Sequence, residues 1–369
     1  MQELSADARR AMEAAMQLAV QRHQAGDVAA AEALYGKVLT ADATHAGALH
    51  NLGLIRLARG DVAASLVLLG AAVEQRPQEP VFQFNLGLAR QNGGDLPGAA
   101  TSYREALRRK PDYRKAWENL GVVLQDLEQP AEAIDAYRHA LTLDGHSPVA
   151  QQNLGNALRA IGQTELALEQ YRAALVVDPL NADLATQYGG TMLSDGDLDG
   201  WDWYEWRYWS PEALQGNAPY HVTLPKWDGG PLTGRELLLY GEQGVGDELM
   251  FASCIPDVLA QGARATLLCE PRLAPLFARS FENVDVQAKP RGGLPPLLAA
   301  KDANRLRCSL ASLPKQVRRS PSSFPGTAWL QADAEATARW RERLAVPGAR
   351  ITIGLSWRGG AAPRAREAR

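Results

Sequence analysis

The sequence predicts an α-solenoid of stacked helix pairs followed by an α/β domain with a parallel sheet. Three observations support this division. A motif recurs every 34 residues through the first half of the chain. From about residue 234, short apolar runs alternate with glycine turns and helical stretches. Between these regions, residues 200–209 hold four of the nine tryptophans. We therefore expect a solenoid over 1–209, a linker over 210–233, an α/β region over 234–350 and a vestigial segment over 351–369.

Composition places the chain among ordinary globular proteins, with 46% hydrophobic and 22% charged residues. No apolar run approaches the ~18 residues of a membrane helix, and the N-terminus lacks a secretory signal. A cytoplasmic location without a membrane span is therefore expected. Cys254, Cys269 and Cys308 lack metal-ligand spacing, so neither a metal nor a cofactor is expected.

Residues 301–369 are basic, with 14 Lys and Arg against 5 Asp and Glu. Such a segment could meet phosphate, acidic lipid or nucleic acid. A charge run is more often a solvated surface, so a nucleic-acid partner is not favoured.

The recurring motif is Asn-Leu-Gly, which begins at Asn51, Asn85, Asn119 and Asn153. Large residues repeat in the second half of each unit, and prolines end several units. A small residue lets two helices approach closely while a large one fills the space beside it, and neighbouring pairs stack into a solenoid. We expect the two helices of successive units to turn near Gly26, Gly60, Gly94, Glu128, Gly162 and Gly196.

These positions resemble the signature of the tetratricopeptide repeat (TPR) family over about residues 12–209, as five full units and a degenerate sixth. The resemblance implies a groove, lined by the first helix of each pair, that binds a polypeptide. The four asparagines would form a ladder in that groove, similar to the ladder in the repeat region of the protein O-GlcNAc transferases. An asparagine can donate and accept, so the ladder could pair with a peptide backbone. Alternatively, these asparagines serve contacts between helices.

Two features narrow the interpretation of the array. The residues two positions before the recurring leucines are His50, Phe84, Glu118 and Gln152, so the lysines of a carboxylate clamp are absent. The tryptophan-rich segment after the fifth unit is interpreted as a helical cap, with a carbohydrate-stacking site as the sharper alternative.

The α/β region is expected to contain strands at Glu236–Tyr240, Ala265–Cys269, Val284–Val286 and Ile351–Ser356, in a Rossmann-like parallel sheet. The turn after the first strand carries Gly241, Gly244 and Gly246. Glycines let the backbone approach a ligand, and the following helix N-terminus favours an anion. A tight strand-to-helix turn also needs glycines, so the loop alone is weak support for a ligand site.

The string from Trp227 through Asp247 and on to Trp357 resembles bacterial proteins that fuse TPRs to a glycosyltransferase-like region. That region is similar to the heptosyltransferases, which have the two-domain GT-B fold. The resemblance implies a nucleotide sugar as donor, metal-independent transfer, and Asp247 as general base. Alternatively, Asp247 caps the helix.

Only the first half of a GT-B fold is expected, because the chain ends 12 residues after Trp357. We therefore predict a protein-interaction scaffold carrying an incomplete transferase domain. An active glycosyltransferase is the alternative.

Overall fold

The computed structural model describes residues 6–210, 224–242, 244–290, 304–324 and 326–344. The chain divides into two compact units, Met1–Leu184 and Ala185–Arg369. The boundary lies inside α11 (Ala182–Ser194), so most of the degenerate sixth repeat belongs to the second unit.

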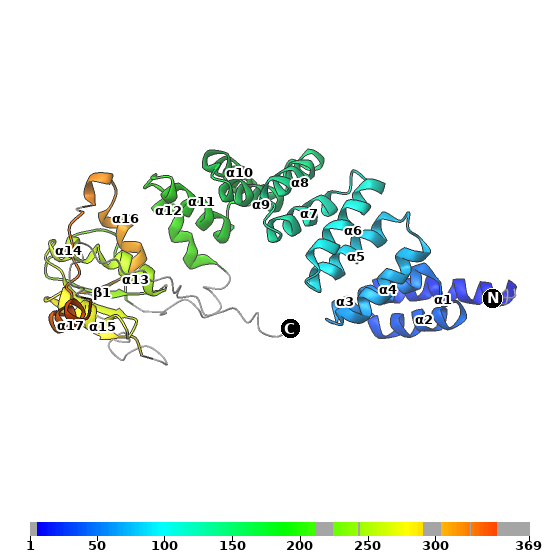
Figure 1. The fold of residues 1–369 in the computed structure, drawn as a ribbon, viewed down its shortest axis with the longest axis horizontal. Helices are drawn as coiled ribbons and strands as arrows, with labels where there is room; N and C mark the ends of the chain where they lie inside the picture. The colour runs from blue at the N-terminus through cyan, green and yellow to red at the C-terminus, as the bar shows by residue number, and fades with distance from the viewer. Residues whose placement is uncertain (1–5, 211–223, 243, 291–303, 325, 345–369) are drawn as a thin grey trace. The chain divides into compact units, whose positions relative to one another are not determined.

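The first unit is a series of antiparallel helix pairs, which follow one another along the chain (Figure 1). The helices are α1 (Ala6–Gln24), α2 (Val28–Ala41), α3 (Ala46–Ala58), α4 (Val62–Gln75), α5 (Pro80–Asn92), α6 (Leu96–Arg109), α7 (Arg114–Asp126), α8 (Pro130–Leu143), α9 (Pro148–Ala160) and α10 (Thr164–Val177). The described residues of this unit contain no strand. The predicted helical solenoid is confirmed for this part of the chain.

Each predicted turn between paired helices is made by a residue with left-handed backbone. Gly26, Gly60, Gly94, Gly162 and Gly196 have φ between 77° and 89°, and Glu128 has φ 59°. In three pairs an aspartate follows and caps the second helix. Asp27, Asp61 and Asp95 accept hydrogen bonds from the backbone N–H three residues later, at 3.2, 3.1 and 3.0 Å. The 34-residue period therefore fixes the position of the turn residue as well as the length of the helices.

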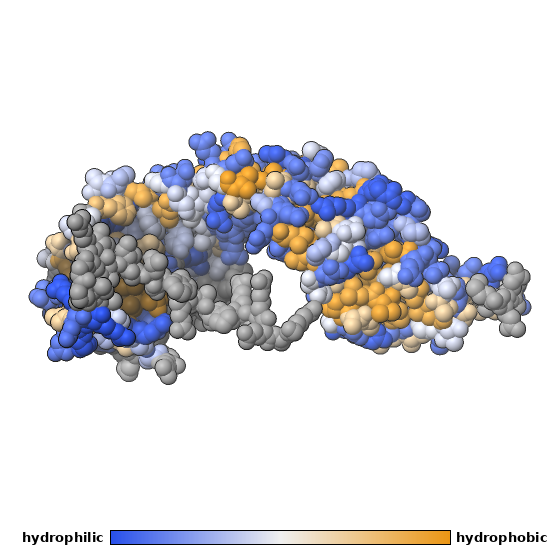
Figure 2. Space-filling view, in the orientation of Figure 1, coloured by the Kyte–Doolittle hydropathy of each residue, from blue (hydrophilic) through white to orange (hydrophobic). Residues whose placement is uncertain are grey.

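The repeat core is built from a glycine and a large ring that face each other within a pair. A Cβ added to Gly121 would lie 2.5 Å from Cε1 of Tyr137, and one added to Gly155 equally close to Tyr171. Both tyrosines are fully buried. Outside this core the helices expose a mixed surface of apolar and polar patches (Figure 2). No helix among the described residues is long and apolar enough to cross a bilayer.

The second unit contains a four-stranded parallel sheet of order β3-β2-β1-β4. The strands are β1 (Glu236–Tyr240), β2 (Arg264–Cys269), β3 (Val284–Ala288) and β4 (Arg305–Ser309). In register, Leu238 pairs with Thr266 of β2 and with Arg307 of β4. The helical segments are α12 (Gly200–Tyr204), η1 (Glu205–Trp209), α13 (Val245–Ala252), α14 (Ile255–Leu259), α15 (Ala274–Ser280), η4 (Leu310–Ser312), α16 (Leu313–Val317), η5 (Pro321–Ser323) and α17 (Ala334–Leu344).

The sheet is parallel, as predicted, but it does not consist of the predicted set of strands. The first three expected strands form, whereas β4 was not expected from the sequence. The expected strand Ile351–Ser356 and the vestigial segment 351–369 lie outside the described residues.

Two segments that flank the sheet contribute to its core. Trp227 and Leu232 are buried in the apolar cluster between sheet and helices, and the Trp227 N–H donates to the Arg307 carbonyl at 2.8 Å. Residues 224–232 are therefore part of the fold and not of the expected linker. Trp201 and Tyr204 of α12 pack against the same cluster. The tryptophan-rich segment is thus a piece of the α/β unit.

Candidate functional site

The four asparagines of the predicted ladder occupy the same turn in α3, α5, α7 and α9. Asn51, Asn119 and Asn153 are partly exposed, whereas Asn85 is 9% exposed. Equivalent positions along the repeat do not therefore have equivalent access to solvent.

The first two asparagines are engaged inside the protein by His50. Asn85 Nδ2 lies 2.7 Å from His50 Nε2, and His50 Nδ1 lies 3.2 Å from Asn51 Oδ1. With Nε2 accepting from Asn85, Nδ1 carries the proton and donates to Asn51. Burial lowers the pKa of His50 below its ordinary 6.5, which favours this neutral form. The ring also stacks on Phe82, with centroids 4.4 Å apart.

The last two asparagines have unused hydrogen-bonding capacity. Asn119 Nδ2 donates to the Tyr103 hydroxyl at 3.5 Å, which is a long contact. Within the described part of the chain, Asn119 Oδ1 and the whole Asn153 carboxamide make no hydrogen bond. Asn119 on α7 and Asn153 on α9 are therefore the members of the ladder that are partly exposed and keep an unbonded carboxamide oxygen among the described residues.

A polar network next to these asparagines links the two helices that carry them. Glu118 Oε1 accepts from Arg114 Nη1 at 2.5 Å and from the Ser147 hydroxyl at 3.0 Å. Ser147 also caps α9, since its hydroxyl accepts the Ala150 N–H at 3.3 Å. The network thus ties α7 to the start of α9. Sequence reasoning missed it, although the single acidic residue beside Asn119 was a visible signal.

In the second unit, the glycine turn connects β1 to α13 and Asp247 lies in the first turn of that helix. Asp247 Oδ2 accepts the Gly244 N–H at 3.2 Å, so the carboxylate caps the helix. A Cβ on Gly241 would overlap the Glu248 carboxyl group, whereas a Cβ on Gly246 would meet open space. Of the three glycines, Gly241 is the one that packing requires most directly.

Two acidic residues that the sequence analysis did not single out hold this edge of the sheet together. Glu248 is 2% exposed, pairs with Lys289 after β3, and accepts the Glu270 N–H after β2 at 2.8 Å. Glu242 accepts from Arg207 of η1, whose Nη2 lies 2.7 Å from Oε1. The two carboxylates therefore connect the carboxyl ends of the strands to one another and to η1.

Arg207 is the centre of a buried polar cluster. Its Nη1 lies 3.1 Å from Glu205 Oε1, and its Nη2 donates to the Tyr208 hydroxyl at 2.6 Å and to Ser312 at 3.1 Å. Burial alone would lower the pKa of Arg207, but its acidic neighbours raise it above the usual value, so the guanidinium stays charged. Glu242 Oε2 is buried and has no hydrogen-bond partner among the residues that the structure describes. Among the described residues, no group of three His, Cys, Asp or Glu is placed to hold a metal.

Residues 22–86, 84–148 and 153–200 match family models of the tetratricopeptide repeat. These helix pairs are tetratricopeptide repeats. A curated relative is FlbA of Caulobacter vibrioides, which is 32% identical over 171 residues. That segment covers 43% of this chain and 28% of FlbA, so the chain spans less than a third of its relative.

Several solved structures are similar to part of this chain. PilF of Pseudomonas aeruginosa has 19% identity and a TM-score of 0.49, covering 57% of this chain and 99% of PilF. YrrB, described as a TPR protein with an unusual peptide-binding site, has 21% identity and a TM-score of 0.44, covering 50% and 98%. MamA has 23% identity and a TM-score of 0.42, covering 44% and 94%.

Proposed function

We propose that the repeat array is an interaction scaffold that binds an extended polypeptide through Asn119 and Asn153. The observation that carries this proposal is the pair of partly exposed carboxamides, in consecutive repeats, with unused hydrogen-bonding capacity. A carboxamide can donate to a peptide carbonyl and accept from a peptide N–H. Recognition of this kind depends on the partner's backbone and tolerates many side chains.

The first half of the ladder has a different role in this proposal. Asn51 and Asn85 are occupied by His50, and Asn85 is buried. They would stabilise the contact between the second and third repeats and would not contact the partner.

The Glu118 network supports the proposal by limiting the entropy lost on binding. Because Glu118 of α7 bonds to Ser147 at the start of α9, the two helices that carry the asparagines are connected. A pre-organised pair of hydrogen-bonding groups costs less to order when the partner arrives.

The test uses a phage-displayed library of random peptides, selected against the full chain and then measured by calorimetry. Asn119→Ala/Asn153→Ala should weaken the selected peptides by roughly ten- to hundredfold, because several hydrogen bonds of ~0.5–1.5 kcal/mol are lost. Asn92→Ala, at the exposed end of α5, is the matched control and should bind normally. Methylation of single peptide amides should weaken binding more than most side-chain changes. Equal affinity for the double variant would refute the proposal.

A second candidate is a glycosyltransferase-like role for the α/β unit, with Asp247 as base. It is favoured by the position of the partly exposed Asp247 after β1, at the edge where parallel sheets bind ligands. The competing role is the helix cap that Asp247 already provides. Nucleoside diphosphate release from nucleotide sugars, present in the unchanged chain and lost in Asp247→Asn, would support catalysis. Absence of release in both would leave Asp247 as a cap.

A further inference from the structure

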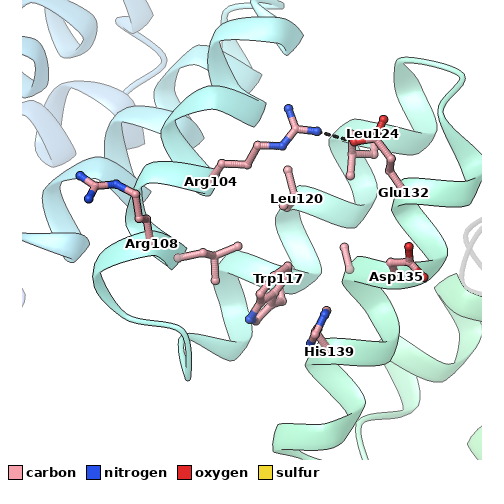
Figure 3. Close-up of a pocket in the computed structure, with 10 residues that line it drawn as sticks. Arg104, Arg108, Trp117, Leu120, Leu124, Glu132, Asp135 and His139 are labelled. Carbon is pink, nitrogen blue, oxygen red and sulfur yellow. Dashed lines mark hydrogen bonds and ion pairs between the residues drawn. The ribbon is translucent and has the colours of Figure 1, made fainter.

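A second groove lies on a different face of α7 from Asn119. Its floor contains Trp117, Leu120 and Leu124, which are spaced as one face of a helix, while Asn119 points away from that face. The walls are α6 and α8, and the groove encloses about 430 Å³ (Figure 3). Leu120 and Leu124 are buried, and Trp117 is partly exposed. Solvent therefore reaches this apolar floor chiefly at Trp117.

The tryptophan in this floor is held in place. Its Nε1 donates to the Pro111 carbonyl at 2.8 Å, and its ring stacks on His139 with centroids 4.5 Å apart and planes 21° apart. A fixed aromatic ring presents a binding surface at low entropic cost.

The two walls carry opposite charges. Arg104 projects from α6 toward the groove with its side chain 50% exposed. The Arg108 guanidinium is bound by Glu105 at 2.5 and 2.8 Å and points away from the floor (Figure 3). Glu132 and Asp135 project from α8, with side chains 57% and 73% exposed. The groove thus has a basic side chain, Arg104, on one wall and two acidic side chains on the other.

One ion pair crosses the groove. Arg104 Nη2 and Glu132 Oε2 meet at 2.6 Å near Leu124, whereas the end near Trp117 is not crossed in this way (Figure 3). Because side chains from the two walls touch each other, a helix ~10 Å across cannot sink between them. An extended chain is narrower. The pair is exposed, so each of its partners can also contact a charge of an extended segment that lies over the groove.

A similar groove of about 490 Å³ lies on the other side of α6 and is lined by Val73, Leu86 and Ser102 among others. Arg104 and Arg108 line both grooves. The groove on the other side of α6 has neither a tryptophan nor a wall with two acidic side chains among its lining residues. These two features distinguish the groove over α7.

We propose that the groove over α7 binds an extended segment of a partner protein in which a large apolar residue lies between acidic and basic residues. The apolar side chain would rest on Trp117, Leu120 and Leu124. The acidic end would face Arg104, and the basic end would face Glu132 and Asp135. This surface is separate from the asparagines, so it does not depend on the function proposed for them.

The probe is a labelled capped peptide with tryptophan between two aspartates and two lysines, followed by fluorescence anisotropy at low salt on the full chain. Comparison peptides replace the tryptophan by serine, or make all four charges acidic or all four basic. The dipolar tryptophan peptide should bind most tightly. Glu132→Arg/Asp135→Arg should weaken it by about tenfold, because two favourable pairs become repulsive, and should strengthen the all-acidic peptide. Arg104→Glu should likewise weaken the dipolar peptide and strengthen the all-basic peptide.

The three substituted side chains are all exposed, and helical circular dichroism checks that the variants fold. Asn92→Ala, which lies outside both surfaces, should leave the dipolar peptide's affinity unchanged. A preference among the four peptides separates this surface from the asparagine site, which tolerates many side chains. The proposal is overturned if the dipolar peptide binds no better than the serine, all-acidic and all-basic peptides. It is also overturned if reversing either wall leaves the preference among the peptides unchanged.

Discussion

Charged side chains stay near the surface of the repeat array but enter the interior of the α/β unit. In the array, the Arg104–Glu132 pair has side chains 50% and 57% exposed. In the α/β unit, the Arg207–Glu242 pair has side chains 11% and 5% exposed. The first pair joins neighbouring repeats, whereas the second belongs to a cluster that also reaches Ser312, 105 residues from Arg207. The repeats therefore rest on local apolar fit, and the α/β unit adds long-range polar contacts to its apolar core.

This difference predicts how the stability of each unit should respond to the loss of one partner of an ion pair. A surface ion pair is worth little because water solvates both partners well when it breaks. A buried pair leaves an uncompensated charge when one partner is removed. The same substitution should therefore have very different effects in the two units.

The largest effect is expected for Arg207→Met. Removing the guanidinium leaves the Glu242 carboxylate, 5% exposed, without its charge partner and should cost about 3–5 kcal/mol of unfolding free energy in the α/β unit. Native-state hydrogen exchange of the β1 amides measures this loss. Arg104→Met in the array is the matched control and should cost less than about 1 kcal/mol. Similar losses of unfolding free energy in the two variants would contradict the difference drawn between the two units.

An intermediate effect is expected where the repeats are tightly fitted. Gly121→Ala places a Cβ 2.5 Å from the buried Tyr137 ring and should destabilise the array by about 1–3 kcal/mol. Gly36→Ala, in the interior of α2, meets no atom within 4 Å and should stabilise by roughly 0.5–1 kcal/mol. Urea unfolding followed by helical circular dichroism compares them. A gain of stability in Gly121→Ala similar to that in Gly36→Ala would show that packing at the repeat glycine does not matter.

A smaller gain is expected at the one repeat turn that lacks glycine. Glu128 has φ 59°, a conformation that costs a residue with a side chain roughly 1–2 kcal/mol. Glu128→Gly should therefore stabilise the array by about 1 kcal/mol after the greater entropy of unfolded glycine is subtracted. Thermal unfolding measures it, with Gly162→Ala expected to move stability in the opposite direction. A loss of stability in Glu128→Gly would mean that the side chain makes a contact worth more than the strain.

The smallest effect concerns the neutral His50 between Asn51 and Asn85. Because burial lowers its pKa below the ordinary 6.5, the unfolded chain binds this proton more tightly than the folded array. Its contribution to stability should be complete above pH 6.5 and should decline as pH falls below that value toward the lower folded pKa. The measurement is unfolding free energy against pH for the unchanged chain and for His50→Gln. The two curves should differ in slope only on the acidic side, and parallel curves throughout would contradict the assignment.

The repeat fold was largely predictable because its signals are local. Each repeat contacts chiefly its sequence neighbours, so the 34-residue period and the turn residues suffice to place the helices. Even Glu128 was placed correctly, since five glycines at equivalent positions defined the register. The α/β unit was less predictable. β4 reads Arg-Leu-Arg-Cys-Ser, and its arginines find partners far along the chain in Glu236 and in the Leu224 carbonyl.

The candidate sites divide in the same way. The sequence identified Asn51, Asn85, Asn119 and Asn153 as equivalent, because the repeat makes them so. It could not show that His50 occupies the first two, since the His50 ring is placed by its contact with Asn85, 35 positions away, and by burial. Similarly, the glycine turn was visible in the sequence, whereas the anchoring of Glu242 by Arg207 was not.

By itself the sequence determined the repeat type, its register, its turns and the presence of a parallel sheet after it. These follow from periodic patterns in which each residue's role is set by near neighbours. Only the tertiary structure decided which asparagines keep free hydrogen-bonding groups, which charges face each other across the groove over α7, and which strand completes the sheet. Polar groups accept any suitable partner, so their pairing is fixed by which chain segments the fold brings together.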